Sequence, residues 1–560
     1  MIHDNAPARR PSRPPRDLAF AHRQADGLAQ LFQVAAAPLT VPSPAVRDLQ
    51  VPAPAPQLRR TWRERLTRHP WPLAAILAVQ AVLSLRLVWS NTAFTDEALY
   101  LWSGHLEWTH WLHGTQLPAF PAYFSGAPVV YPPLGALADT YGGLAGARIL
   151  SLAFMLLATC ALYGTGARIF GQRAGLFGAG LFVSGAATQF LGAFATYDAM
   201  ALSLLAGATW LAVRSAACRR MLAQAALLAL AGVALALADA AKYAATLFDP
   251  VVFAVAVLMT WRARGRLPDG AAAGVAVFAV TSAVLAAALR AAGRQYWRGI
   301  AYTTLSRAHG TSSPFGIVAD SIGWAGLTAL LAVFGLAALL VTQAPLPQRL
   351  MGCALAGAVA LAPANQARIH VFTSLFKHVG FGAWFAAIIG GYALAALACA
   401  VPKVKERGAA LASAGAVSLC ATVGLMLAQT HFLSWPNTAR FTAALQTTLP
   451  GRPGNILAAD NGNVIEYYLP GDTGHDLFYA PSFFQYRDRT TGQHLTGLPA
   501  YKDAIRQGFF AVIALSFNDS RLIDGRLDRY ITASGRYRLT AVLPYELSGK
   551  QSAFRIWTAR

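Results

Sequence analysis

The sequence predicts an α-helical membrane protein that crosses the bilayer many times and ends in a small α/β domain. Apolar residues make up 55% of the chain and charged residues only 13%, whereas soluble proteins carry roughly 25% charged residues. The mean hydropathy is +0.42, and long apolar runs fill the region from Trp71 to Gln429. The net charge of +21 does not indicate nucleic-acid binding, because the basic residues form short clusters between apolar runs.

Three regions follow from the composition. Residues 1–60 are rich in proline, alanine and arginine and have no long apolar run, which predicts a disordered cytoplasmic tail and not a cleaved signal peptide. Residues 61–430 contain the predicted membrane domain, and residues 431–560 the predicted soluble domain.

Apolar runs of about 17–25 residues are long enough to span a bilayer as helices. On this basis we expect about eleven spans, in chain order: 71–89, 144–163, 174–190, 198–213, 221–238, 246–261, 271–290, 317–341, 350–363, 379–400 and 408–428.

The basic residues give the expected orientation. With eleven spans, the clusters at 59–68, 168–173, 214–220, 262–266 and 403–407, together with Arg349, all fall on one side. Positively charged loops remain in the cytoplasm. We therefore expect a protein of the plasma (inner) membrane, with a cytoplasmic N-terminus and an extracytoplasmic C-terminal domain.

Acidic residues are rare in the apolar region, and two of the ten, Asp96 and Glu97, are adjacent directly after the first span. Asp198 stands at the outer start of the fourth span. A carboxylate beside lipid is costly unless it faces water or a partner, so these residues are candidates for an outward-facing active site. The alternative for any single outer acid is a solvated or helix-capping residue.

The C-terminal region alternates short strand and helix patterns. We expect strands at 455–459, 509–517, 537–543 and 554–557 and helices at 464–469 and 500–507. No glycine-rich phosphate loop joins a strand to a helix here, so we expect no nucleotide site. The domain either shapes an acceptor groove or only stabilises the membrane part.

An ordered set of motifs resembles the GT-C superfamily of polyprenyl-phosphate-sugar-dependent glycosyltransferases. The set comprises Phe94-Thr95-Asp96-Glu97-Ala98-Leu99-Tyr100, Phe124-Ser125-Gly126, Tyr131-Pro132-Pro133-Leu134-Gly135, Ala147-Arg148 and Thr196-Tyr197-Asp198. The pattern is most similar to protein O-mannosyltransferases and lipid A aminoarabinose transferases, over about residues 71–430. The resemblance implies a GT-C-like membrane domain and a polyprenyl-phosphate-linked sugar as donor.

The resemblance also implies that Asp96 is the catalytic carboxylate. The chemistry requires the same group. Phosphate is already a good leaving group and needs no general acid, so the enzyme needs a base that takes the proton from the acceptor hydroxyl. One displacement inverts the anomeric centre. Glu97 would support Asp96 or position the acceptor, and Asp198 would orient either substrate. Tyr131, Pro132 and Pro133 are the expected substrate loop.

Cations on the outer side are candidates to hold the donor phosphate. These candidates are Lys242, Arg368, His370, Lys377 and His378. Their positions oppose the positive-inside trend, although a single outer lysine also commonly contacts lipid headgroups.

No cofactor is expected to be required, although a divalent metal near His105, Glu107, His110 and His113 stays open because some relatives bind one. No metal site is assigned, and the five cysteines lack metal-ligand spacing. The acceptor is a hydroxyl of a protein, a glycolipid or a wall polysaccharide. Two other classes stay open: a lipid or sugar transporter, which would show repeats or broken midplane helices, and a non-catalytic envelope assembly protein.

Overall fold

The structure is a computed structural model that describes residues 71–307, 309–400, 406–452, 454–458, 462–470, 477–478, 484–518, 521–547 and 549–560. The predicted tail, residues 1–60, lies outside the described residues. The described residues form one compact unit.

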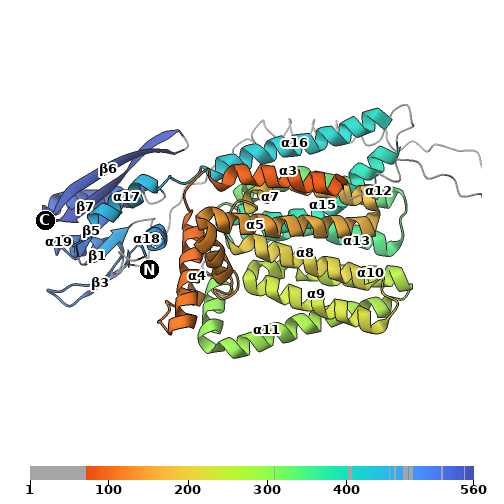
Figure 1. Cartoon of the computed structure of the whole chain (residues 1–560), viewed down its shortest axis with the longest axis horizontal. Coiled ribbons are helices and arrows are strands. Elements are labelled where there is room, and N and C mark those ends of the chain that lie inside the picture. The colour runs from red at the N-terminus through yellow and green to blue at the C-terminus, as the bar shows by residue number, and fades with distance from the viewer. Residues whose placement is uncertain are drawn as a thin grey trace, which may run out of the picture. The chain divides into compact units, whose positions relative to one another are not determined.

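The membrane domain is built of helices (Figure 1). In chain order they are α3 (Trp71–Val88), α4 (Thr95–His113), η1 (Phe120–Ala122), α5 (Pro132–Phe170), α6 (Gln172–Ser184), α7 (Ala186–Leu191), α8 (Tyr197–Ser215), α9 (Met221–Ala241), η2 (Tyr243–Phe248), α10 (Asp249–Arg264), α11 (Leu267–Thr303), α12 (Pro314–Val341), α13 (Leu346–Gly357), η3 (Ala358–Ala360), α14 (Leu361–Ile369), α15 (Leu375–Ala400) and α16 (Glu406–Phe432).

Each of the eleven predicted spans falls on helical chain, which confirms the polytopic α-helical fold. Nine helical segments of the described chain are long and apolar enough to cross a membrane. The third and fourth predicted spans are not among them, because α6 and α7 are two short helices and α8 is made less apolar by Asp198 in its first turn and Arg214 in its last. These interior helices pack against other helices and need less lipid-facing surface.

Helix α4 was not expected, since its residues belong to the predicted first outer loop. Its sequence explains it: Asp96 and Glu97 stand in the first turn, where negative charge favours a helix, and Gly114 ends it in the left-handed conformation (φ 68°). In Figure 1, α4 lies across the end of the bundle that adjoins the C-terminal domain. The residues after the first span are therefore held on a helix.

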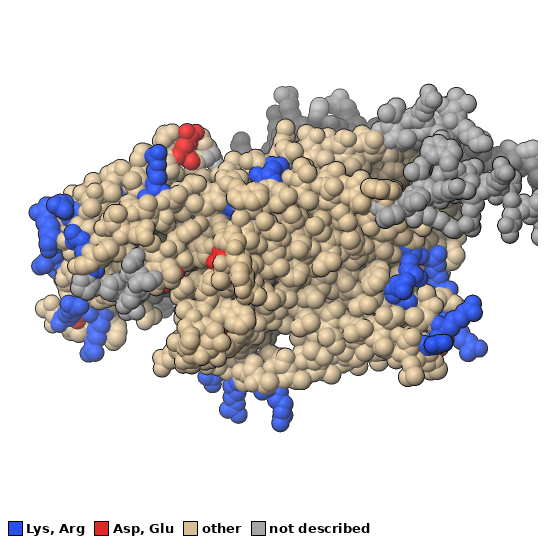
Figure 2. All heavy atoms as spheres, in the orientation of Figure 1, with Lys and Arg blue, Asp and Glu red and all other residues tan. Residues whose placement is uncertain are grey.

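Charged side chains are concentrated at the ends of the bundle. Figure 2 shows Lys and Arg there and over the C-terminal domain, with a nearly uncharged surface between. The basic loops at 214–220 and 262–266 join α8 to α9 and α10 to α11, at the end opposite α4 (Figure 1). This distribution is the one expected of a helical bundle in a bilayer.

The C-terminal domain is the predicted α/β domain. It contains α17 (Ala439–Thr448), β1 (Asn455–Ala458), α18 (Gly462–Tyr468), β2 (Leu477–Phe478), β3 (Gln485–Arg487), β4 (His494–Thr496), α19 (Gly497–Arg506), β5 (Phe510–Leu515), α20 (Arg521–Ser534), β6 (Tyr537–Leu547) and β7 (Lys550–Ala559).

Five strands form a mixed sheet in the order β2-β1-β5-β7-β6. Strands β2, β1 and β5 are parallel, whereas β7 is antiparallel to both β5 and β6. All four predicted strands and both predicted helices are present. Strands β3 and β4 form a separate antiparallel pair that the sequence patterns did not indicate.

Candidate active site

A cavity of about 710 Å³ opens where α4, α12, α15 and α16 meet. Its lining residues are Phe94, Thr95, Asp96, Asp320, Trp324, Phe372, Thr373, Ser374, Leu375, Phe376, Leu427, Thr430, His431 and Ser434. The volume is in the usual range of about 300–1,000 Å³ for small-molecule sites. Of the predicted site residues, only Asp96 lines this cavity.

Asp96 begins a chain of four alternating charges that leads from the cavity into the protein. Lys377 Nζ donates to Asp96 Oδ2 at 2.7 Å and lies 3.8 Å from Asp198 Oδ2. Lys242 Nζ lies 2.8 Å from Asp198 Oδ1. The Asp96 side chain is 30% exposed, whereas those of Lys377, Asp198 and Lys242 are at most 2% exposed. Four residues that are far apart in sequence thus form one network with a single accessible carboxylate.

Asp96 keeps one free acceptor atom. Oδ2 accepts the bond from Lys377, and Oδ1 has no hydrogen-bond partner among the residues that the structure describes. A carboxylate oxygen that is free beside a cavity can accept a proton from a bound hydroxyl.

Lys242 is presented by a break between two helices. Its backbone is extended (φ −147°, ψ 110°) between α9 and η2. The predicted Phe124-Ser125-Gly126 motif fixes this break, because Tyr243 N donates to Ser125 O at 2.9 Å and Ala127 N donates to Ala240 O at 2.7 Å. A Cβ atom on Gly126 would come within 2.1 Å of Ala241 O, so only glycine allows this close approach.

Glu97 faces away from the cavity and is fully buried against Arg148. Arg148 Nε donates to Glu97 Oε1 at 2.8 Å and Nη2 donates to Oε2 at 2.7 Å. The backbone N–H groups of Phe94 and Ala195 donate to the same carboxylate. Glu97 therefore lies outside the cavity, and its predicted role, to support Asp96 or to position the acceptor, stays a prediction.

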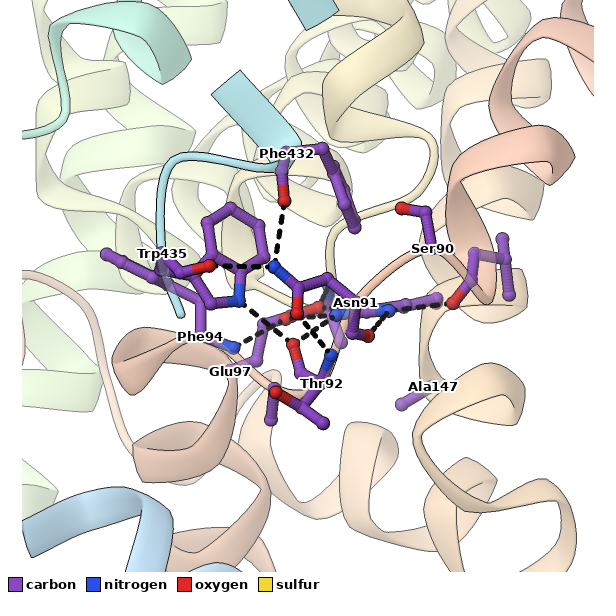
Figure 3. A network of polar contacts seen from close by, with 12 residues as sticks. Ser90, Asn91, Thr92, Phe94, Glu97, Ala147, Phe432 and Trp435 are labelled. Carbon is purple, nitrogen blue, oxygen red and sulfur yellow. Dashed lines mark hydrogen bonds and ion pairs between the residues drawn. The ribbon is translucent and has the colours of Figure 1, made fainter. Parts of the chain in front are cut away.

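Arg148 also fixes the connection that precedes α4. Its guanidinium donates to the carbonyl oxygens of Val88, Asn91 and Thr92. Asn91 Nδ2 in turn donates to Phe432 O and Trp435 O, at the end of α16. Figure 3 shows Glu97 in one connected set of hydrogen bonds with Asn91, Thr92 and Trp435. The Arg148–Glu97 ion pair therefore holds the start of α4, and with it Asp96, in a defined position.

The five predicted phosphate-binding cations divide into two groups. Lys242, Lys377 and His378 lie together: His378 is within electrostatic range of both lysines, and its buried Nε2 has no hydrogen-bond partner among the described residues. Arg368 is exposed and donates to Asn365 Oδ1, and the His370 ring bonds to Ser312 O. Neither of these contacts belongs to the charge network, so Arg368 and His370 stay predictions without support from its geometry.

The predicted substrate loop at Tyr131, Pro132 and Pro133 is buried and does not line the cavity. The two prolines open α5, because proline lacks an N–H and is favoured at the first helical positions. Tyr131 packs with Tyr100, Phe124 and Tyr197 in an aromatic cluster beneath α4. These contacts indicate a structural role for the motif.

The C-terminal domain contacts the start of α4 through α18. Tyr468 OH accepts from Ala93 N at 2.9 Å, and Asn463 Nδ2 donates to Thr95 Oγ1 at 3.1 Å. Tyr467 OH donates to Asp139 Oδ1 at 2.6 Å. Burial is the main cause, and this hydrogen bond the second, of a raised pKa for Tyr467, so the phenol is neutral. The C-terminal domain therefore contacts Ala93 and Thr95, which flank Phe94 and precede Asp96 in the chain.

Two of the three histidines of α4 contact other groups. His105 Nε2 lies 2.7 Å from Asp139 Oδ2, and His110 Nδ1 lies 2.6 Å from Thr115 O. Burial raises the pKa of Glu107. Within the described ranges, no group of three or more His, Cys, Asp or Glu side chains is placed to hold a metal ion.

Several residues at the site were missed from the sequence. Trp324 and His431 line the cavity, and Arg307 is within electrostatic range of His378. Asp320 also lines the cavity, and no role was predicted for it from the sequence. Its position six residues into a membrane helix was the available signal, because a carboxylate there is costly unless it faces water or a ligand.

Comparisons by sequence find no match for this chain, whereas comparisons by structure do. Neither a protein-family model nor a curated protein sequence matches the chain. Solved structures do match. The oligosaccharyltransferase of Archaeoglobus fulgidus, tethered to an acceptor peptide, has a TM-score of 0.52 at 13% identity, over 87% of this chain and 74% of that chain.

Two further membrane glycosyltransferases are similar in structure. ArnT of Cupriavidus metallidurans bound to undecaprenyl phosphate has a TM-score of 0.52 at 15% identity, over 87% of this chain and 98% of that chain. The mycobacterial arabinofuranosyltransferase AftD has a TM-score of 0.51 at 14% identity, over 88% of this chain and 40% of that chain. These likenesses confirm the predicted fold, and the chain therefore has the GT-C fold of these membrane glycosyltransferases.

Proposed function

We propose that the protein is an inverting glycosyltransferase that moves a sugar from a polyprenyl-phosphate donor to a hydroxyl acceptor on the outer face of the membrane. The observation that carries this proposal is the accessible Asp96 carboxylate at the cavity, joined through Lys377 to the buried Asp198–Lys242 pair. An ordinary surface ion pair would need neither a cavity beside it nor a second, buried ion pair such as Asp198–Lys242.

The reaction is a single displacement at the anomeric carbon. The acceptor oxygen forms a bond to C1, the bond from C1 to the phosphate oxygen breaks, and its electron pair leaves with the phosphate. The acceptor proton passes to Asp96 Oδ1, the oxygen that Lys377 leaves free.

The charge network responds to this proton transfer. Before reaction the two aspartates and two lysines carry no net charge together, and protonation of Asp96 leaves the group with one positive charge. That charge develops together with the negative charge on the departing phosphate. We propose that the positive charge of Lys377 and Lys242 stabilises the leaving group, with His378 beside both lysines.

The donor class is supported by the structural neighbours. The ArnT structure contains undecaprenyl phosphate, and another structure of the Archaeoglobus enzyme contains dolichol-phosphate with an inhibitory peptide. Both are polyprenyl phosphates. The acceptor of the present protein is proposed only as a hydroxyl group, on protein, glycolipid or cell-wall glycan.

The outer side of the plasma membrane is the proposed site of action. Asp96, Lys242 and Lys377 belong to the bundle end at α4, and the basic loops at 214–220 and 262–266 lie at the opposite end (Figure 1). Basic loops remain cytoplasmic, so the cavity would face outward.

We propose that no metal ion is required. Lys377 Nζ contacts Asp96 and approaches Asp198, so a lysine provides the positive charge between the two carboxylates. Transfer by purified protein should be the same with and without a chelator such as EDTA. A loss of activity with EDTA that Mg²⁺ or Mn²⁺ restores would contradict this part of the proposal.

The test of the function uses purified protein and radiolabelled undecaprenyl-phosphate-linked mannose, glucose and arabinose. We expect at least one donor to be consumed, with release of undecaprenyl phosphate and a product whose anomeric configuration is opposite to that of the donor. A product with retained configuration would contradict the single displacement. If the lipid crosses vesicle membranes without sugar transfer, the transporter alternative would replace this proposal.

A further inference from the structure

A second functional group lines the cavity on helix α12. Asp320 and Trp324 are four residues apart, which places both side chains on one helix face, and both line the cavity that Asp96 also lines. Neither residue belongs to the charge network. The part of the cavity lined by Asp320 and Trp324 therefore has no role in the proposed deprotonation of the acceptor or stabilisation of the phosphate.

Asp320 has no hydrogen bond or ion pair with any residue that the structure describes, and it is exposed. It stands on a helix that is long and apolar enough to cross the membrane. A carboxylate on such a helix is unfavourable unless it faces water or a bound group. Its unpaired negative charge also disfavours a phosphate beside it.

Trp324 is held by neighbouring rings. His431 packs edge-on against it, with ring centroids 5.4 Å apart and an interplanar angle of 89°. The Phe376 ring centroid lies 6.0 Å from that of Trp324 and 4.0 Å from that of His431. All three residues line the cavity, so the half-buried Trp324 ring packs against two other rings and also borders the cavity.

We propose that Asp320 and Trp324 bind a sugar ring in this cavity. A sugar ring has a C–H face that packs against an aromatic ring and hydroxyl groups that donate to a carboxylate. It fits beside Asp320 where a phosphate does not. This inference rests on the proposed function, and the ring belongs either to the donor or to a glycan acceptor.

The first arm of the test measures equilibrium binding by the purified full-length protein. The probes are undecaprenyl-phosphate-linked mannose, glucose and arabinose, and undecaprenyl phosphate without sugar. If the ring is the donor's, Asp320→Asn and Trp324→Leu should each weaken binding of a sugar-bearing lipid by about tenfold and leave the sugar-free lipid unchanged. Trp297→Leu is the matched control, because Trp297 is 52% exposed and does not line the cavity.

The second arm compares transfer to octyl glycosides with release of the sugar to water. If the ring is the acceptor's, donor binding and release to water stay at wild-type levels in both variants, and transfer to the glycoside falls. Both results support a sugar subsite and distinguish its source.

Two outcomes would count against the inference. If the wild-type protein consumes a donor and both variants match it in binding, transfer and hydrolysis, the sugar subsite is wrong and the proposed function stands. If the wild-type protein neither prefers a sugar-bearing lipid nor consumes one, the proposed function fails, and the subsite fails with it.

Discussion

Removal of Arg148 should destabilise the protein strongly. Arg148 donates five hydrogen bonds, two to Glu97 and three to backbone carbonyl oxygens before α4, and both side chains are fully buried. In Arg148→Met the Glu97 carboxylate would stay buried with only two backbone N–H donors. Loss of one partner from a buried ion pair costs about 3–5 kcal/mol.

The double variant Glu97→Gln with Arg148→Met provides the matched comparison. It leaves no charge at either of these two buried positions, so it should lose less stability than Arg148→Met alone, even though it has two substitutions. Thermal unfolding of the purified protein in detergent measures both. An Arg148→Met protein that melts at the wild-type temperature, or a double variant whose loss equals the sum of the single losses, would refute this reasoning.

Three further predictions concern other parts of the protein. Lys377→Met should lower turnover by about 100-fold, because it removes the cation that contacts Asp96 and that we propose stabilises the leaving group; the matched control, Lys550→Met on β7, changes an exposed lysine of the C-terminal domain and should be silent in the same transfer assay. Tyr468→Phe removes the hydrogen bond to Ala93 N and should lower kcat about fivefold with unchanged donor binding; unchanged kcat would show that the C-terminal domain does not position α4. Reporter fusions after Leu66 and after Arg440 should report opposite sides of the membrane, and the same side for both would overturn the outward orientation of the cavity.

The fold was predictable because the two strongest sequence signals describe it directly. Apolar runs of span length appear as helices, and the short continuous apolar run at Phe510–Leu515 appears as a buried strand. Helix α4 was missed because hydropathy identifies spans and is silent on a helix that lies across the bundle end. Its capping signals, Asp96 and Glu97 before Gly114, were available in the sequence.

The site was predictable only in part. Asp96, Asp198, Lys242, Lys377 and His378 were identified because each is an ionisable group at the expected outer end of a span, and the structure brings them together.

The pairing within the site was not predictable, because it depends on contacts between residues up to 281 positions apart. Sequence adjacency suggested that Asp96 and Glu97 act together, whereas successive helical residues point in different directions. Asp96 therefore reaches the cavity while Glu97 is buried against Arg148. Arg368 and His370 are close to Lys377 in sequence and belong to a different helix and its end.

The most direct test of the account is sugar transfer by the Asp96→Asn variant. Asparagine keeps the size of the side chain and cannot take the acceptor proton, so turnover from a labelled undecaprenyl-phosphate sugar should fall by about 100- to 10,000-fold. Donor binding and thermal stability should stay near wild type. Glu546→Gln, an exposed change in the C-terminal domain, is the control and should be fully active. An Asp96→Asn protein that keeps most of its activity would contradict the assignment of Asp96 as the base and would favour the transporter or assembly-protein alternative.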